Sequence, residues 1–271
     1  MGFKPGPEFH SVSCALAETS LPVVASGSTM KFRQVLVVLL ISLFFSGCAS
    51  TLAPADKARI HRVGVISLVG DSIRGSYVGM TVFNNEYYDA AVPDFALDQI
   101  LETESARSIG SGSVALPMER EAVRSAAGYT RFFGGTAPYD VSRAAGVIRG
   151  IAAQRKLDAL AIWTPTVFED HGMRLSGASL SAGLFGKKMG AGIHAVMGVY
   201  DGATGTRLAG NIGSVSNGGA WGSASPGILD IRWRDKFDQF TPQEREALRA
   251  EFQRQAREKG ASAPRNLGIA R

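Results

Sequence analysis

The chain has little cysteine, with only Cys14 and Cys48 among its 271 residues. Two cysteines cannot form the several disulfides that hold small secreted domains together, so a fold of this length must depend on a hydrophobic core. CxxC and HxxxH spacings are also absent, and the adjacent residues Glu169, Asp170 and His171 cannot converge on one ion without ligands from elsewhere. The sequence therefore argues against a disulfide scaffold and predicts no metal centre.

Basic residues are in slight excess but do not cluster along the sequence. The chain has 29 Lys and Arg against 24 Asp and Glu, a net charge of +5. No run of them is interleaved with aromatic residues, which is the pattern that binds a phosphate backbone. Nucleic acid is therefore not an expected partner, and the composition of 45% hydrophobic and 20% charged residues is that of a globular protein.

Long apolar runs are also missing. A helix that spans a bilayer needs ~20 apolar residues, and the most apolar segment, Val35 to Phe45, is much shorter. Lys31 and Arg33 precede this segment, and small residues separate it from Cys48. A short basic region, an apolar region and small residues, in that order, form the plan of a secretion signal.

Residues 30–47 resemble the signal of bacterial lipoproteins, in which the lipobox ends in a cysteine that becomes lipidated. The resemblance implies cleavage before Cys48 and attachment of diacylglyceryl and N-acyl (palmitate-type) chains there, enough lipid for stable anchoring. Phe45 departs from the pattern, because the lipobox usually has Leu at that position. Two alternatives stay open: an ordinary cleaved signal that leaves Cys48 as a free thiol, and a retained transmembrane anchor.

The segments on either side of this signal have different expected roles. Residues 1–29 lack the basic-then-apolar plan and are expected to be an extension upstream of a true start at Met30. Residues 48–58 would be the lipidated cysteine and a short tether that holds the folded body close to the lipid headgroups. Ala49, rather than Asp, follows Cys48, and in many Gram-negative bacteria this directs a lipoprotein to the outer membrane. The expected location is the cell envelope, at the outer membrane facing the periplasm.

Residues 59–235 predict a single mixed α/β domain. Its expected form is two layers, with about five or six strands in a mixed sheet and helices packed on the sheet. Residues 236–271 predict a C-terminal amphipathic helix and tail, which begin at the capping box formed by Thr241 and Glu244. Within the domain, apolar patterns predict strands at 63–69, 77–83, 113–118 and 157–166 and helices at 93–109, 119–127 and 140–156.

The glycine-rich lobe 171–192 is expected to be a surface lobe or the mobile tip of a hairpin. A phosphate-binding loop needs the pattern GxxxxGK followed by Ser or Thr, but Ser181 stands where the first glycine should be and Lys188 where the hydroxyl should be. A nucleotide cofactor is therefore not predicted. A hairpin follows, with a turn over Asp201–Gly205.

The order of elements resembles the α/β domain of periplasmic assembly lipoproteins, such as the curli-secretion lipoprotein, the lipoprotein activators of penicillin-binding proteins, and the amino-terminal domain of TolB. The matching features are the strand at 63–69, the helix-to-strand junction at 156–162 and the turn at 199–205, and the resemblance covers about residues 60–210. It implies a membrane-tethered domain, without enzymatic activity, that binds other envelope proteins or itself.

The main alternative is an enzyme. Gly70-Asp71-Ser72 is similar to the first block of GDS-type (SGNH) serine esterases, a resemblance that would make Ser72 the nucleophile and His194 a candidate base. That family supplies its base in an Asp-x-x-His block, and Ala191 stands where the aspartate of His194 should be. A serine without a base is a poor nucleophile, so non-enzymatic binding is the favoured interpretation.

Overall fold

The computed structural model describes eight segments of the chain, and they belong to one compact unit that spans residues 47–271. Cys48, the signal 30–47 and the extension 1–29 lie outside these segments, as do His171 and residues 184–188 of the glycine-rich lobe. The described segments are 49–79, 85–128, 131–132, 135–136, 139–170, 173–183, 189–211 and 227–270.

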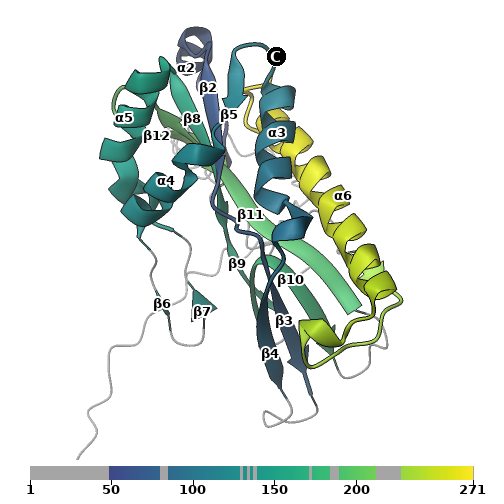
Figure 1. Ribbon diagram of the computed structural model, residues 1–271. Coiled ribbons are helices and arrows are strands. Elements are labelled where there is room, and N and C mark those ends of the chain that lie inside the picture. The colour runs from purple at the N-terminus through teal and green to yellow at the C-terminus, as the bar shows by residue number, and fades with distance from the viewer. Residues whose placement is uncertain are drawn as a thin grey trace, which may run out of the picture. The chain divides into compact units, whose positions relative to one another are not determined.

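A large mixed sheet forms the centre of this unit (Figure 1). The strands are β1 (Ala49–Ser50), β2 (Val63–Ser67), β3 (Ser72–Val78), β4 (Glu86–Ala91), β5 (Ser113–Ala115), β6 (Arg131–Phe132), β7 (Gly135–Thr136), β8 (Ala159–Pro165), β9 (Val167–Asp170), β10 (Met173–Gly183), β11 (Met189–Asp201), β12 (Arg207–Asn211) and β13 (Gly227–Leu229). The main path through the sheet is β4-β3-β10-β11-β8-β2-β5, and β6 pairs only with β7.

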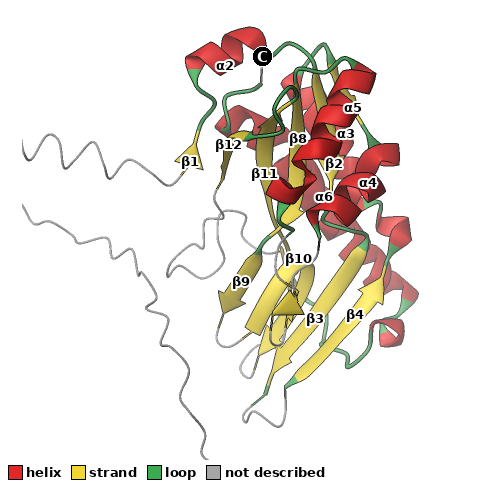
Figure 2. Cartoon of the chain, turned by 90° about the vertical axis from the view of Figure 1, so that its left-hand side faces the viewer, coloured by secondary structure: helices red, strands yellow, loops and turns green. Residues whose placement is uncertain are grey.

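The 13-residue strand β11 joins two parts of the sheet. Its first half pairs with β10, as far as the pair His194 and Gly177, and its second half pairs with β8, from the pair Ala195 and Pro165 onward. On its other edge β11 pairs with β13 near its start and with β12 near its end. β11 therefore connects the parallel strands β5, β2 and β8 to β10, β3 and β4 (Figure 2). In this second part β3 is parallel to β10 and antiparallel to β4.

Helices cover both faces of the part that contains β2 and β8. The α-helices are α2 (Pro54–Arg59), α3 (Leu97–Ile109), α4 (Arg120–Ala127), α5 (Ala145–Arg155) and α6 (Pro242–Asn266), and the 3₁₀ helices are η2 (Pro93–Phe95), η3 (Pro117–Glu119), η4 (Val141–Ala144) and η5 (Phe237–Gln239). Val65 of β2 packs in one core with Leu101 of α3 and Phe252 of α6. Ile66 of β2 packs in a second core with Ile148 of α5. Successive strand residues point to opposite faces, so a strand buried along its whole length requires cover on both sides.

The predicted fold class is confirmed: the chain forms a mixed α/β fold with a C-terminal helix. The sheet has more strands than the five or six expected, and this part of it has three layers instead of two. The predicted capping box is present, because the Thr241 side chain accepts from the Glu244 N–H and the Glu244 side chain accepts from the Thr241 N–H. The helix that it begins continues to Asn266.

The expectation for the glycine-rich lobe was wrong for most of its described residues. Residues 173–183 form β10 and residues 189–192 begin β11, and both strands lie inside the sheet rather than on a surface lobe. Ala178 and Leu180 are buried. Glycine weakens a strand because it has no side chain to pack, but β10 has strand partners on both sides, and these ladders override the weak local preference.

One edge of β11 is completed by a side chain instead of a strand. Between its pairs with β13 and β12, the N–H of Ile193 donates to Oε1 of Gln255 at 3.1 Å, and the carbonyl of Ala191 accepts from Nε2 at 2.7 Å. Gln255 belongs to α6 and is fully buried. Its amide therefore supplies one donor and one acceptor, as a neighbouring strand would.

The folded unit includes the residues next to Cys48. Ala49 and Ser50 form β1, which pairs with Asn211 and Gly210 of β12. Leu52 is 6% exposed, and its N–H donates to the carbonyl of Leu267 at 3.0 Å. The segment 48–58, expected to be a tether, thus contains a strand, a buried apolar residue and most of α2.

Candidate functional site

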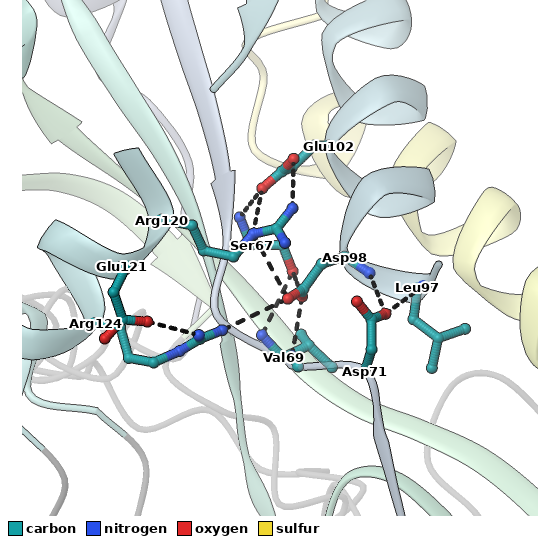
Figure 3. Close-up of polar contacts among 10 residues, drawn as sticks. Ser67, Val69, Asp71, Leu97, Asp98, Glu102, Arg120, Glu121 and Arg124 are labelled. Carbon is teal, nitrogen blue, oxygen red and sulfur yellow. Dashed lines mark hydrogen bonds and ion pairs between the residues drawn. The ribbon is translucent and has the colours of Figure 1, made fainter. Parts of the chain in front are cut away.

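A cluster of charged side chains lies at the carboxyl end of β2 (Figure 3). Asp98 and Glu102 are one turn apart on α3, and each side chain is only 1% exposed. Arg120 and Arg124, both on α4, face them. In open α/β sheets ligands bind beyond the carboxyl ends of the strands, so this cluster is a candidate functional site.

The strongest contact in the cluster joins Arg120 to Glu102. The guanidinium donates through Nε at 3.1 Å and through Nη2 at 2.9 Å to the two carboxylate oxygens. Glu102 also accepts from the backbone N–H of Ser67 at 2.8 Å. Paired bonds of this kind are the geometry in which arginine binds a carboxylate most strongly, so they tie α4 and the end of β2 to α3.

Asp98 binds the chain that leaves β2. Its carboxylate accepts from the Ser67 hydroxyl at 2.5 Å and from the Gly70 N–H at 3.0 Å. Nε of Arg120 and Nη2 of Arg124 each lie 3.6 Å from its other oxygen. Two carboxylates therefore face two guanidinium groups, and the buried charges of the cluster compensate one another.

Burial changes the proton affinity of both acids. Desolvation raises the pKa of Asp98, which the Ser67 hydroxyl and Arg120 only partly oppose. Desolvation likewise raises the pKa of Glu102, against the hydrogen bond from Arg120. The folded chain thus binds these protons more tightly than the unfolded chain. The stability that the two acids contribute is therefore greatest below the ordinary carboxyl pKa, and it falls as the pH rises through the raised pKa values of the folded state.

Asp71 of the Gly70-Asp71-Ser72 stretch positions α3. The residue before α3 is Ala96, which offers no side-chain acceptor to the first N–H groups of the helix. Oδ1 of Asp71 accepts from the Leu97 N–H at 2.7 Å and from the Asp98 N–H at 3.3 Å. Asp71 therefore caps a helix that begins 26 residues later in the chain.

Replacing Asp71 by alanine should lower the free energy of unfolding by about 1 kcal/mol, because the substitution removes this cap. Urea denaturation of the full chain would measure the change. Ser72→Ala is the matched control, since Ser72 is the exposed neighbouring residue and its loss should change stability by less than about 0.5 kcal/mol. Equal losses in the two variants would contradict the capping role.

The structure places Ser72 and His194 on different strands. Ser72 begins β3, His194 lies in β11, and β10 runs between them. Strands two places apart in a sheet are about 10 Å from one another, which is well beyond the length of a hydrogen bond. Burial, with a contribution from Lys259, lowers the pKa of His194 to about 4. An imidazole with so low a pKa is a weak general base at neutral pH.

The cluster itself was not predicted, although the sequence of α3 contains a signal for it. Leu97 and Leu101 lie on the buried side of that helix. Asp98 comes directly after Leu97 in the sequence and Glu102 directly after Leu101, and both acids are buried too. Acids placed within an apolar helical stripe indicate buried charges, which are usually paired. Their partner Arg120 lies in another helix, which the spacing of residues cannot reveal.

Comparisons with protein-family models, with curated proteins and with solved structures found no match. Among the helices that the structure describes, none is long and apolar enough to span a membrane. The described residues also hold no group of three His, Cys, Asp or Glu side chains arranged to bind a metal ion.

Proposed function

We propose that the protein is an envelope lipoprotein, anchored by lipid on Cys48 and facing the periplasm, which binds other envelope proteins or further copies of itself. The observation that carries this proposal is the continuity between the signal and the fold. The basic, apolar and small residues of 30–47 end at Cys48, and β1 begins at the next residue. Cleavage before Cys48 would remove the signal and leave the folded unit whole.

A binding role, rather than catalysis, fits the chemistry of the described side chains. The most strongly buried charges, Asp98 and Glu102, direct their oxygens to partners within the chain. Ser72 is exposed at the start of β3, and β10 separates β3 from the strand that carries His194. A serine needs an adjacent base to act as a nucleophile, so the described arrangement supports scaffolding over ester hydrolysis.

Metabolic labelling with a fatty-acid analogue tests the anchor. The wild-type chain should carry label, and Cys48→Ala should carry none, because the proposed lipidation begins at the thiol of Cys48. Cys14→Ala is the matched control and should label like the wild type, since Cys14 lies in the upstream extension. Crosslinking in membranes followed by capture of the protein would then identify what it binds. An unlabelled wild-type chain would contradict the proposal.

A further inference from the structure

One end of the folded unit carries the excess positive charge of the mature chain. We call this the tether end and define it by residues 54–62, 155–158, 201–207 and 265. Backbone bonds hold these segments together: Asp158 donates to the carbonyl of Arg62 and accepts from the N–H of Gly202. The residues after Arg265 join them, since Leu52, just before α2, bonds to Leu267.

The charge count of this end differs from that of the rest of the chain. Residues 49–271 hold 26 Lys and Arg and 22 Asp and Glu. The tether end accounts for seven of the basic residues and three of the acidic ones, so the remainder is balanced at 19 of each. The seven basic residues are Lys57, Arg59, Arg62, Arg155, Lys156, Arg207 and Arg265.

The three acids of the tether end bind groups of the same segments, and only Asp201 is buried. Asp201 is buried and binds Arg59, along with the N–H groups of its own turn. Asp158 accepts from the backbone N–H groups of His61 and Arg62 at 2.8 Å each. The third acid, Asp56, is partly exposed and also binds Arg59. The carboxylates of the tether end are therefore bound to Arg59 and to backbone N–H groups.

The basic side chains, by contrast, reach the surface. Lys57, Lys156 and Arg265 are exposed, and none of them makes an ion pair with a described carboxylate. Arg62 is exposed as well, and its guanidinium donates to the carbonyl of Arg155. Arg155 binds Glu119, an acid outside these segments, so the excess of four falls to three. The ends of α5 and α6 contribute about half a negative charge each, which still leaves the tether end positive.

The residue that follows the anchor pairs with a strand that starts at the tether end. Ala49 pairs with Asn211 at the far end of β12, and β12 starts at Arg207, four residues or about 13 Å away. Figure 2 shows β1 next to β12, with α2 close to the last described residues of the chain. A lipid on Cys48 would thus bring the positive end of the molecule to within reach of the headgroups.

We infer that the tether end lies against anionic lipid headgroups and so orients the domain on the membrane. The inference rests on the proposed lipidation of Cys48, which supplies the proximity. Each basic residue close to an anionic surface strengthens the attraction about fivefold, and the effect falls away beyond the Debye length of about 10 Å. Lys57 and Lys156 would face the lipid, and Lys236, at the other end of α6, would face away.

Lysine labelling on vesicles tests this orientation. Lipidated protein purified from membranes is reconstituted into vesicles of phosphatidylcholine alone and into vesicles that also contain phosphatidylglycerol. A water-soluble amine reagent should modify Lys57 and Lys156 at least about fivefold more slowly on the anionic vesicles, whereas Lys236 should react at the same rate on both. High salt should remove the protection, because it screens the attraction.

A charge-reversal variant separates this contact from simple crowding at the membrane. Arg62→Glu combined with Arg265→Glu should abolish the protection of Lys57 and Lys156. Arg232 is exposed and lies outside the tether end, so the control variant Arg232→Glu should keep the protection. Equal labelling of all three lysines on neutral and anionic vesicles would overturn the inference while leaving the anchor in place. Protein that fails to enter either kind of vesicle would instead overturn the proposed lipidation and the inference with it.

Discussion

Replacing Arg120 by alanine should lower the free energy of unfolding by about 3–5 kcal/mol, because it leaves buried carboxylates without their main partner. Glu102 would lose two hydrogen bonds, and Asp98 would lose one of its two nearby guanidinium groups. Urea denaturation followed by circular dichroism would measure the loss. Arg149→Ala on α5 is the matched control, since Arg149 is exposed and its loss should cost less than about 0.5 kcal/mol.

The cost of Arg120→Ala should also depend on pH. Protonation removes the uncompensated charges, and the raised pKa values of Asp98 and Glu102 mean that the folded state binds these protons readily. The difference in stability from the wild type should therefore shrink between about pH 7 and about pH 4.5. Adding Glu102→Gln to the variant should recover part of the loss at pH 7. A cost that is the same at both pH values would mean that Arg120 acts through packing alone.

Replacing Gln255 by leucine should cost about 3 kcal/mol, the second large effect. The side chain would leave the Ile193 N–H and the Ala191 carbonyl buried without partners, and each unsatisfied group costs roughly 1–3 kcal/mol. The free energy of unfolding measures this loss, and hydrogen exchange should show faster exchange at the Ile193 amide.

Gln243→Leu, an exposed position on the same helix, controls for the change of glutamine to leucine and should alter stability by less than about 0.5 kcal/mol. If Gln255→Leu were as stable as this control, the amide would not be needed to complete the edge of β11.

Features that depend on neighbouring residues could be predicted from the sequence. The capping box of α6 is formed by residues three apart, Thr241 and Glu244. Asp201 likewise accepts from Ala203 and Thr204 within its own turn, as the Asp201–Gly205 pattern predicts. Local hydrogen bonds of this kind join residues two or three positions apart, so the types of a few neighbouring residues are enough to predict them.

The same reasoning failed where long-range pairing decides the structure. The lobe 171–192 is rich in glycine, and a local reading of its weak strand preference indicates a loop. Its described part forms β10 and the start of β11 because β3, which lies far earlier in the chain, pairs with β10, as in the pair Ile73 and Ala178. Ladder bonds to distant strands supply the stability that the local sequence lacks.

By itself the sequence determined the mixed α/β class and several of the helices, because hydrophobic periodicity and short motifs indicate them. The signal that ends at Cys48 stays a prediction from the sequence. Only the tertiary structure decided what the polar residues do. Asp98 meets Ser67 across 31 residues, and Gln255 meets Ile193 across 62. Contacts of such separation depend on how whole elements pack, and packing also gathers the scattered basic residues of the sequence at the tether end.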